Sequence, residues 1–194
     1  MKKKIIWIAL AVVLVVFLAV SAKVIDKGTE GQYTGVTAFD AGASSSDDWD
    51  GVVAEVMEKA EDAASLDPKS LGDGKAVKMT GTVSEYVSKA AGKKNAIIVV
   101  PDGYSGDAIF SVQLGSIYSG TSVRDVQTKK VFGDFTNQTE WSQYAKALNE
   151  MLHERVVTPA GIDENAKGKK ITVIGAATAS GNEVTITPVA LTVE

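Results

Sequence analysis

An apolar segment at the start of the chain differs from everything that follows it. Three lysines come after Met1, and residues 5–22 are then uncharged and almost wholly apolar. A helix of this length rises about 27 Å, which is enough to cross the hydrocarbon core of a membrane. Because the lysine cluster should stay in the cytoplasm, we expect the rest of the chain to be extracytoplasmic.

Two interpretations of this segment remain open. The small residues Val20-Ser21-Ala22 have the form of a signal-peptidase site, so cleavage after Ala22 would release the mature protein. The apolar run is longer than the core of a typical signal peptide, which favours an uncleaved anchor. We therefore predict a signal anchor over residues 1–22, with a signal peptide as the alternative. Residues 23–46 contain glycines and end in three serines, and are predicted to be a tether.

The segment after the tether has apolar residues at the spacing of one helix face. It predicts a helix over residues 47–66, with Ser46, Asp47 and Asp48 capping its first turn and Asp67-Pro68 ending it. The apolar positions are Trp49, Val52, Val53, Val56, Met57, Ala60 and Ala64.

From about residue 75 the pattern changes to alternation of apolar and polar residues, which is typical of half-buried strands. Three strands are predicted, within residues 77–84, 95–100 and 110–114. Gly81 lies in the middle of the first strand, where we expect a bulge or a sharp bend. The following residues are less regular, and we expect a helical turn near residues 122–126 and a short extra strand at residues 130–132.

A second helix is predicted from Asn137 to Val157, where apolar residues again recur at helical spacing. Asn137 and Glu140 form a capping-box pattern at its start, and Thr158-Pro159 ends it.

Two more strands complete the pattern, one within residues 171–175 and one that begins at Val184. Ser180-Gly181-Asn182 predicts a hairpin turn between them. After Pro188 the apolar positions shift by one residue, which indicates a bulge.

The order of three strands, a helix and two strands is that of an OB-fold barrel. The sequence therefore predicts a mainly β domain of the α+β class over residues 47–194. Residues 75–193 are expected to form a five-stranded OB-like barrel, with a helix between strands three and four and the helix 47–66 in front.

Composition removes several kinds of chemistry. The chain has no cysteine, which excludes disulfides, thiolate ligands and an acylated cysteine within these 194 residues. Its one histidine, His153, lies beside the apolar stripe of the second helix, so we expect it to be exposed. A histidine-based triad or zinc site is therefore unsupported. We predict no catalytic residue, no metal and no cofactor.

The charge balance argues against nucleic acid as a partner. Removing residues 1–22 takes away three of the 20 basic residues and none of the 24 acidic ones, which leaves a formal charge of −7. Binding to a phosphate backbone needs a basic surface. We therefore expect no affinity for DNA or RNA, although these are common ligands of OB barrels.

Several strings resemble an uncharacterised family of predicted periplasmic lipoproteins. The strings are Gln113-Leu114-Gly115-Ser116-Ile117, Gly120-Thr121-Ser122-Val123-Arg124-Asp125, the segment Phe132-Gly133-Asp134-Phe135-Thr136-Asn137-Gln138-Thr139-Glu140-Trp141 and Ile186-Thr187-Pro188-Val189. The resemblance implies a small exported protein with an OB-like barrel, of unknown activity, often encoded beside sugar ABC transporters. A lipid anchor on cysteine, which the family's name implies, cannot form within these residues, so attachment would depend on residues 5–22.

The segment from Asp134 to Trp141 is the best candidate for function, with two interpretations. In the structural one, Phe135 and Trp141 pack in the core while Asn137 and Glu140 cap the helix. In the functional one, polar side chains line a recess beside an aromatic ring, as sites for sugars or peptide backbones do. The candidate ligand-binding residues are Arg124, Asp125, Asp134, Asn137, Gln138 and Trp141.

We therefore predict a membrane-anchored binding or accessory protein. Its expected partners are the membrane, through residues 5–22, and a protein or a small polar ligand such as a sugar; a link to solute uptake follows from the resemblance. The alternatives are an envelope hydrolase or transferase that uses carboxylates or a Ser/Lys pair, and a structural envelope protein.

Overall fold

The computed structural model describes residues 38–72, 74–118, 120 and 122–194. The predicted anchor and most of the tether, up to residue 37, lie outside these residues. Asp40–Glu194 form one compact unit. No helix within the described residues is long and apolar enough to cross a membrane.

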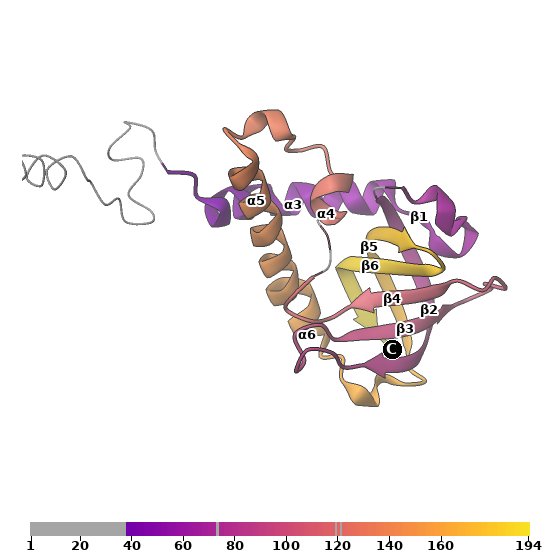
Figure 1. The fold of residues 1–194 in the computed structure, drawn as a ribbon. Coiled ribbons are helices and arrows are strands. Elements are labelled where there is room, and N and C mark those ends of the chain that lie inside the picture. Colours follow the sequence, from indigo (N-terminus) through magenta and orange to yellow (C-terminus); the bar gives the residue numbers. More distant parts are fainter. Residues whose placement is uncertain (1–37, 73, 119, 121) are drawn as a thin grey trace, which may run out of the picture. The chain divides into compact units, whose positions relative to one another are not determined.

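Five strands close into a barrel (Figure 1). Hydrogen bonds join them in the order β2-β3-β4-β6-β5, and β5 pairs again with β2. The β4–β6 pair is parallel, and the other four pairs of barrel strands are antiparallel. The predicted five-stranded barrel is thereby confirmed. The strands are β2 (Lys75–Val87), β3 (Ala96–Pro101), β4 (Ile109–Gln113), β5 (Lys170–Ser180) and β6 (Glu183–Val193).

The alternation in the sequence corresponds to the inside and outside of this barrel. Val77, Met79 and Val83 of β2 are buried, whereas Lys78 and Thr82 are exposed. The core is completed by apolar residues of the other strands, which follow the same alternation. They include Ile97, Val99, Phe110, Val112, Ile171, Val173, Val184 and Ile186.

Gly81 has a different role from the one predicted. The register of β2 against β3 shifts between Val83 and Glu85, so the bulge lies three residues after Gly81. A Cβ atom at Gly81 would overlap the carbonyl oxygen of Val100 in β3. Glycine is therefore needed here because two backbones approach closely.

The bulge predicted after Pro188 is confirmed. Ile174 pairs with Ala190 and Gly175 pairs with Pro188, so Val189 is an extra residue in β6. The predicted hairpin is also present, because Ser180 pairs with Glu183 across Gly181, whose φ is 60°.

The first helix, α3 (Ala41–Lys59), begins and ends earlier than the predicted helix 47–66. Its N-cap is Asp40, whose carboxylate accepts a hydrogen bond from the Ala43 amide at 2.9 Å. Ser46, Asp47 and Asp48 therefore lie inside the helix, and the prediction that they cap it is wrong. Serine and aspartate favour helix caps, so residues 44–48 resemble a helix start. In the structure, however, the buried face of α3 begins at Ser45 and continues through Trp49 and Val52, so the helix must start before Ser45.

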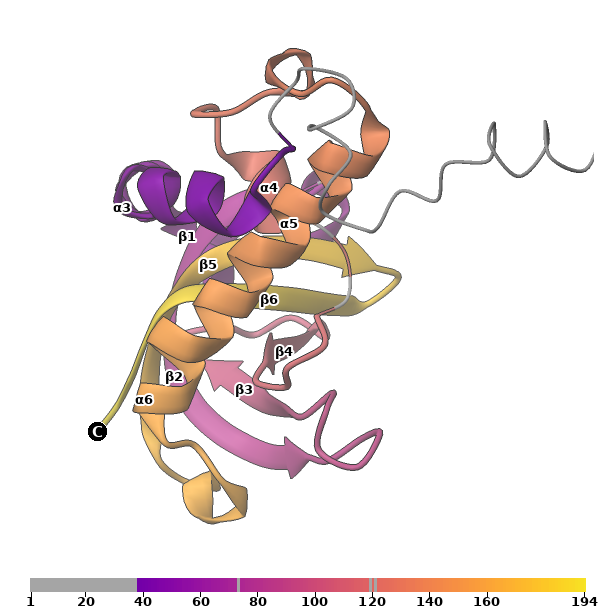
Figure 2. The same ribbon diagram turned by 90° about the vertical axis from the view of Figure 1, so that its left-hand side faces the viewer.

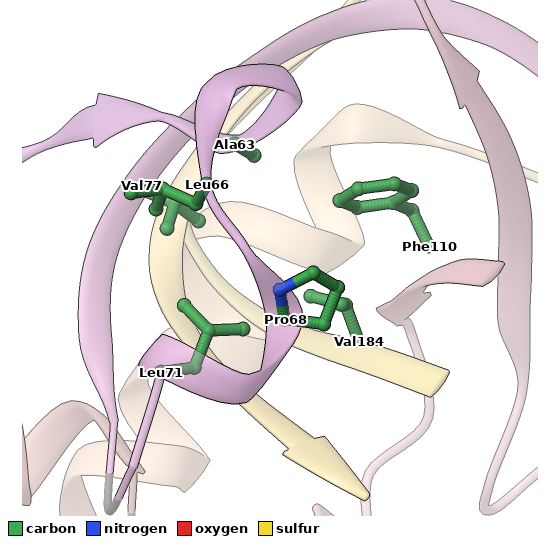
Figure 3. A pocket seen from close by; sticks show the side chains of 7 residues that line it. All are labelled: Ala63, Leu66, Pro68, Leu71, Val77, Phe110 and Val184. Atoms are coloured by element: carbon green, nitrogen blue, oxygen red, sulfur yellow. The ribbon is translucent and has the colours of Figure 1, made fainter. Parts of the chain in front are cut away.

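The segment after α3 covers one end of the barrel. Short β1 (Glu61–Asp62) runs parallel to β2, and two 3-10 turns, η1 (Ala63–Ser65) and η2 (Pro68–Ser70), follow it. Ala63, Leu66, Pro68 and Leu71 face Val77, Phe110 and Val184 of the barrel (Figure 3). These seven apolar side chains leave no space for a water molecule, so the arrangement is a packed cover and not a binding site.

Between β4 and β5 the chain forms α4 (Ser122–Val126), the 3-10 turn η3 (Phe132–Asp134) and α5 (Gln138–Leu152). The helical turn expected near residues 122–126 is confirmed, whereas the extra strand expected at residues 130–132 is wrong. A side chain explains this difference, because Asp134 accepts a hydrogen bond from the Val131 amide at 2.9 Å and closes a turn there.

The second long helix does not end where Thr158-Pro159 predicted. A π-helical segment, His153–Val157, and a short α6 (Thr158–Ala160) continue it to Gly161, which has a left-handed φ of 60°. Thr158 and Pro159 therefore lie within the continued helix and do not end it. In Figures 1 and 2, α3, α4 and α5 lie together beside the barrel, and α5 packs on both other helices.

Candidate functional site

A shallow, open depression of about 590 Å³ lies where the loop after α4 meets the first turn of α5. Three residues predicted as ligand contacts, Arg124, Asp125 and Trp141, line it together. The other lining residues are Gln127, Lys130, Val131 and Phe132, and we call the site the Arg124 depression.

Gln127 fixes the loop that forms one wall of the depression. Its side chain is buried, and its amide nitrogen donates to the carbonyl oxygens of Arg124 at 2.9 Å and Lys130 at 2.7 Å. Its amide oxygen accepts from the Lys130 backbone at 2.9 Å. One side chain therefore closes the loop between these two residues.

Glu55 of α3 holds the same loop from behind. Both of its carboxylate oxygens accept from the Thr128 amide at 2.9 Å, and one also accepts from the Thr128 hydroxyl at 2.6 Å. Burial would raise the pKa of Glu55, but hydrogen bonds from Lys59 and Thr128 outweigh burial and lower this pKa to about 2. Glu55 is therefore charged at neutral pH and ties the loop to α3.

Arg124, Asp125 and Trp141 form the polar part of the depression. The Arg124 guanidinium lies over the Trp141 ring, 4.3 Å from its centroid, and pairs with the Asp125 carboxylate at 2.6 Å. The side chain of Arg124 is only 11% exposed. A guanidinium held on both sides in this way has a fixed direction, which is useful for recognition of a carboxylate or a carbonyl.

Aromatic rings make up the apolar part. Phe135 lies 5.0 Å from Trp141 and 5.3 Å from Tyr144, and Trp141 stacks parallel to Tyr144. Phe132 meets Trp141 edge to face at 6.4 Å and is 51% exposed. Tyr144 is fully buried, and its hydroxyl lies 3.2 Å from an Asp48 carboxylate oxygen, so the cluster is anchored on α3.

The other three predicted ligand contacts do not line the depression. Asp134 caps η3, and Asn137 caps α5 by accepting from the amides of Thr139 at 2.9 Å and Glu140 at 3.0 Å. Gln138 is exposed in the first turn of α5. The structural interpretation therefore holds for Asn137.

That interpretation holds only in part for the neighbouring residues. Glu140 does cap, but it accepts from the Thr136 amide at 2.8 Å. Phe135 and Trp141 are half-buried at the surface, so their predicted place in the core is wrong.

The sequence did not indicate Val131 and Phe132, although they are 53% and 51% exposed at the rim of the depression. The strand expected at residues 130–132 does not predict this exposure. A glycine and an aspartate directly after Phe132 were the available signal, because this composition favours a turn.

The prediction that His153 is exposed is also wrong. His153 is half-buried in the π-helical segment, 6.5 Å from the Tyr118 ring, and its Nδ1 has no hydrogen-bond partner among the residues that the structure describes. Burial raises the pKa of the neighbouring Tyr118. The Tyr118 ring comes from a distant part of the chain, so a helical projection of the sequence does not anticipate its contact with His153.

In the described part of the chain, no group of three His, Asp or Glu side chains could hold a metal ion. The chemistry that the depression offers is recognition by a guanidinium, an ammonium and aromatic rings.

Residues 70–192 match a family described as "Predicted periplasmic lipoprotein (DUF2291)". The chain belongs to this family. The match confirms the resemblance seen in the strings between Gln113 and Val189. The family description is in line with the expected extracytoplasmic, membrane-anchored location, and it names no activity.

No curated protein sequence matches the chain. Among solved structures, an OB-fold protein from Thermotoga maritima is similar, with 16% sequence identity and a TM-score of 0.57. The match covers 81% of this chain and 100% of that one. At this identity the likeness shows the fold alone, and it confirms the OB-like barrel.

Proposed function

We propose that this protein is an extracytoplasmic binding module, held at the membrane by residues 5–22, and that the Arg124 depression docks a protein partner. The observation that carries the proposal is the pair Val131 and Phe132, which expose about half of their side chains at the rim. Val131 and Phe132 are adjacent, and Phe132 also meets the Trp141 ring, so the three side chains form one continuous apolar patch. Such patches often mark surfaces that another protein covers.

The composition of the depression fits a protein surface better than a sugar. Arginine and aromatic residues dominate the centres of protein interfaces, and Arg124, Phe132 and Trp141 supply them here. A sugar usually stacks on an open aromatic face, whereas the Arg124 guanidinium already lies over the Trp141 ring. Gln127 and Glu55 hold the loop in place before a partner binds, so binding requires little further loss of conformational entropy in the loop.

The chemistry of the depression favours binding over hydrolysis or group transfer. Asp125, the acidic residue of its lining, is paired with Arg124, and Asp134 lies outside the lining and caps its own turn. Both carboxylates are therefore used locally.

We propose further that the partner belongs to a solute-uptake system and that this protein acts as its accessory. This step is supported by the resemblance to proteins often encoded beside sugar ABC transporters.

Affinity capture from native membranes tests the proposal. The full-length protein is compared with the double variant Val131→Ser/Phe132→Ser and with Met57→Ser, which alters an exposed apolar residue outside the depression. We expect one membrane-associated protein to be retained by the native chain and by Met57→Ser, and reduced roughly tenfold or more with the double variant. Thermal unfolding checks that all three are folded. Recovery of the same proteins by all three chains would contradict a docking role for the depression.

A further inference from the structure

A second recess, distinct from the Arg124 depression, lies on the outer face of the barrel where β4 and β6 run parallel. Its volume is about 280 Å³. Its lining is mostly polar and comes from the β2–β3 loop, β3, β4, the loop after β4 and β6. The residues are Lys89, Lys94, Asn95, Ala96, Ser111, Gln113, Ile117, Glu183 and Thr185, and we call it the β4–β6 recess.

The floor of the recess follows from the strand register. Ser111 pairs with Thr185, and both point outward because the alternate residues Phe110, Val112 and Val184 are buried in the core. Ser111 is only 6% exposed and yet lines the recess. No hydrogen bond to its hydroxyl is formed within the described part of the chain. Its side chain lines the recess, so a polar ligand there can reach the Ser111 hydroxyl.

Two amide side chains make the walls rigid. Gln113 donates to the Thr187 hydroxyl at 2.8 Å, and this hydroxyl lies 2.9 Å from that of Ser122. Asn95 donates to the Tyr86 hydroxyl at 2.6 Å and accepts from Ser88 at 3.1 Å. The recess therefore exists before any ligand arrives, which lowers the cost of binding.

The β2–β3 loop is held over the recess in a costly conformation. Ala90 and Ala91 both have a φ of 52°, in the left-handed region that residues other than glycine rarely adopt. Such a conformation is unfavourable and persists only where the surrounding structure enforces it. Here the Ile117 amide donates to the carbonyl oxygen of Lys93 at 2.8 Å, which ties the loop to the chain after β4.

Opposite charges face the recess from different elements. Lys89 and Lys94 come from the β2–β3 loop, and Glu183 comes from β6. Among the described residues none of the three forms an ion pair. All three are exposed, so they are free to contact a ligand.

From this arrangement we propose that the β4–β6 recess binds an acidic saccharide, that is, a sugar that carries one carboxylate. The two ammonium groups meet the carboxylate of the ligand, while Glu183, Ser111 and Thr185 bind its hydroxyl groups. Serine and threonine hydroxyls can donate and accept, which suits sugar hydroxyls. The outer face and loops of OB barrels also bind oligosaccharides in other proteins.

Calorimetry with the full-length chain in detergent tests this proposal. The probes are galacturonate, its trimer, galactose and acetate. We expect galacturonate or the trimer to bind saturably, galactose to bind at least roughly tenfold more weakly, and acetate not to bind. Tighter binding of the trimer would identify a polysaccharide as the source of the ligand, and equal binding would identify a free sugar.

Variants then locate the binding. Lys89→Ala/Lys94→Ala should reduce galacturonate affinity to the level of galactose, and Glu183→Gln should weaken both sugars. Lys167→Ala, which removes an exposed lysine away from the recess, is the matched control and should bind like the native chain.

Three results would each overturn the proposal. They are binding of acetate as strong as that of galacturonate, no saturable binding of either uronate probe, and equal binding by the double lysine variant and the native chain. Because Val131→Ser/Phe132→Ser leaves this recess untouched, failure here and failure of the docking proposal are separate results.

Discussion

At the residue scale, the structure depends on a few polar side chains that each join two segments. Gln127 closes the loop of the Arg124 depression, and Glu55 ties the same loop to α3. Glu55 is 9% exposed, so the bonds that keep it charged must offset the cost of burying a charge. Removing either side chain would leave backbone groups of the loop without partners.

The pKa of Glu55 makes its contribution to stability dependent on pH. Its folded-state pKa, about 2, lies below the ordinary value of 4.5, so its contribution is present above pH 4.5 and is lost as the pH falls towards 2. We predict that Glu55→Gln lowers the free energy of unfolding at pH 7 by about 2 kcal/mol. The difference from the native chain should shrink between pH 4.5 and pH 3.

Urea unfolding at a series of pH values measures this effect. Glu58→Gln, an exposed position on the same helix, is the control and should keep the native pH dependence. A Glu55→Gln variant whose stability falls with pH as steeply as that of the native chain would show that Glu55 does not carry this dependence.

At the scale of the elements, the start of α5 decides the geometry of the Arg124 depression. Asn137 sets the first turn, and Trp141 follows one turn later on the face that meets Arg124. The same helix buries Tyr144, Leu148 and Leu152 behind the depression. A change in where α5 begins would therefore move Trp141 relative to the loop.

We predict that Asn137→Ala lowers the free energy of unfolding by about 1 kcal/mol, because two amides of the first turn lose their acceptor. In a domain of this size the melting temperature should fall by about 2–4 °C, as measured by circular dichroism. Asn137→Asp keeps an acceptor and should remain close to the native value. Gln138→Ala removes an exposed side chain next to the cap, and an equal loss of stability there would argue against capping as the cause.

At the scale of the whole molecule, the compact unit from Asp40 to Glu194 is joined to an N-terminal segment of different character. The unit carries the barrel, both proposed binding surfaces and most of the acidic charge. The proposal that residues 5–22 anchor the protein therefore concerns the location of the compact unit, and not its folding.

We predict that the N-terminal segment stays attached. The intact mass of protein extracted from membranes should then correspond to the full chain of 20.3 kDa. Ala22→Leu, which removes the small residue that a signal peptidase requires, should give a full-length protein as well. A native protein that begins at Lys23, together with a longer Ala22→Leu variant, would show that the segment is a signal peptide.

Much of the fold was determined by local sequence. Alternating residues such as Val77 and Met79 predicted strands, and Asn137 predicted the start of α5, because both depend on neighbours within a few positions. The order of the elements then predicted the barrel. Ser46 and Asp47 are residues that favour a helix cap, and the sequence therefore predicted a start that is too late. The buried face of α3 begins earlier, at Ser45, and Asp40 is the residue that caps the helix.

Only the tertiary structure decided which side chains meet. Of the six predicted contacts, three line the Arg124 depression, because Asp134 and Asn137 are used as caps and Gln138 faces solvent. The β4–β6 recess could not be predicted, since Ser111 and Thr185 are brought together by parallel pairing of strands far apart in the chain. Hydrophobic pattern specifies which face of a strand is buried, but the neighbour of that strand is chosen by closure of the whole barrel.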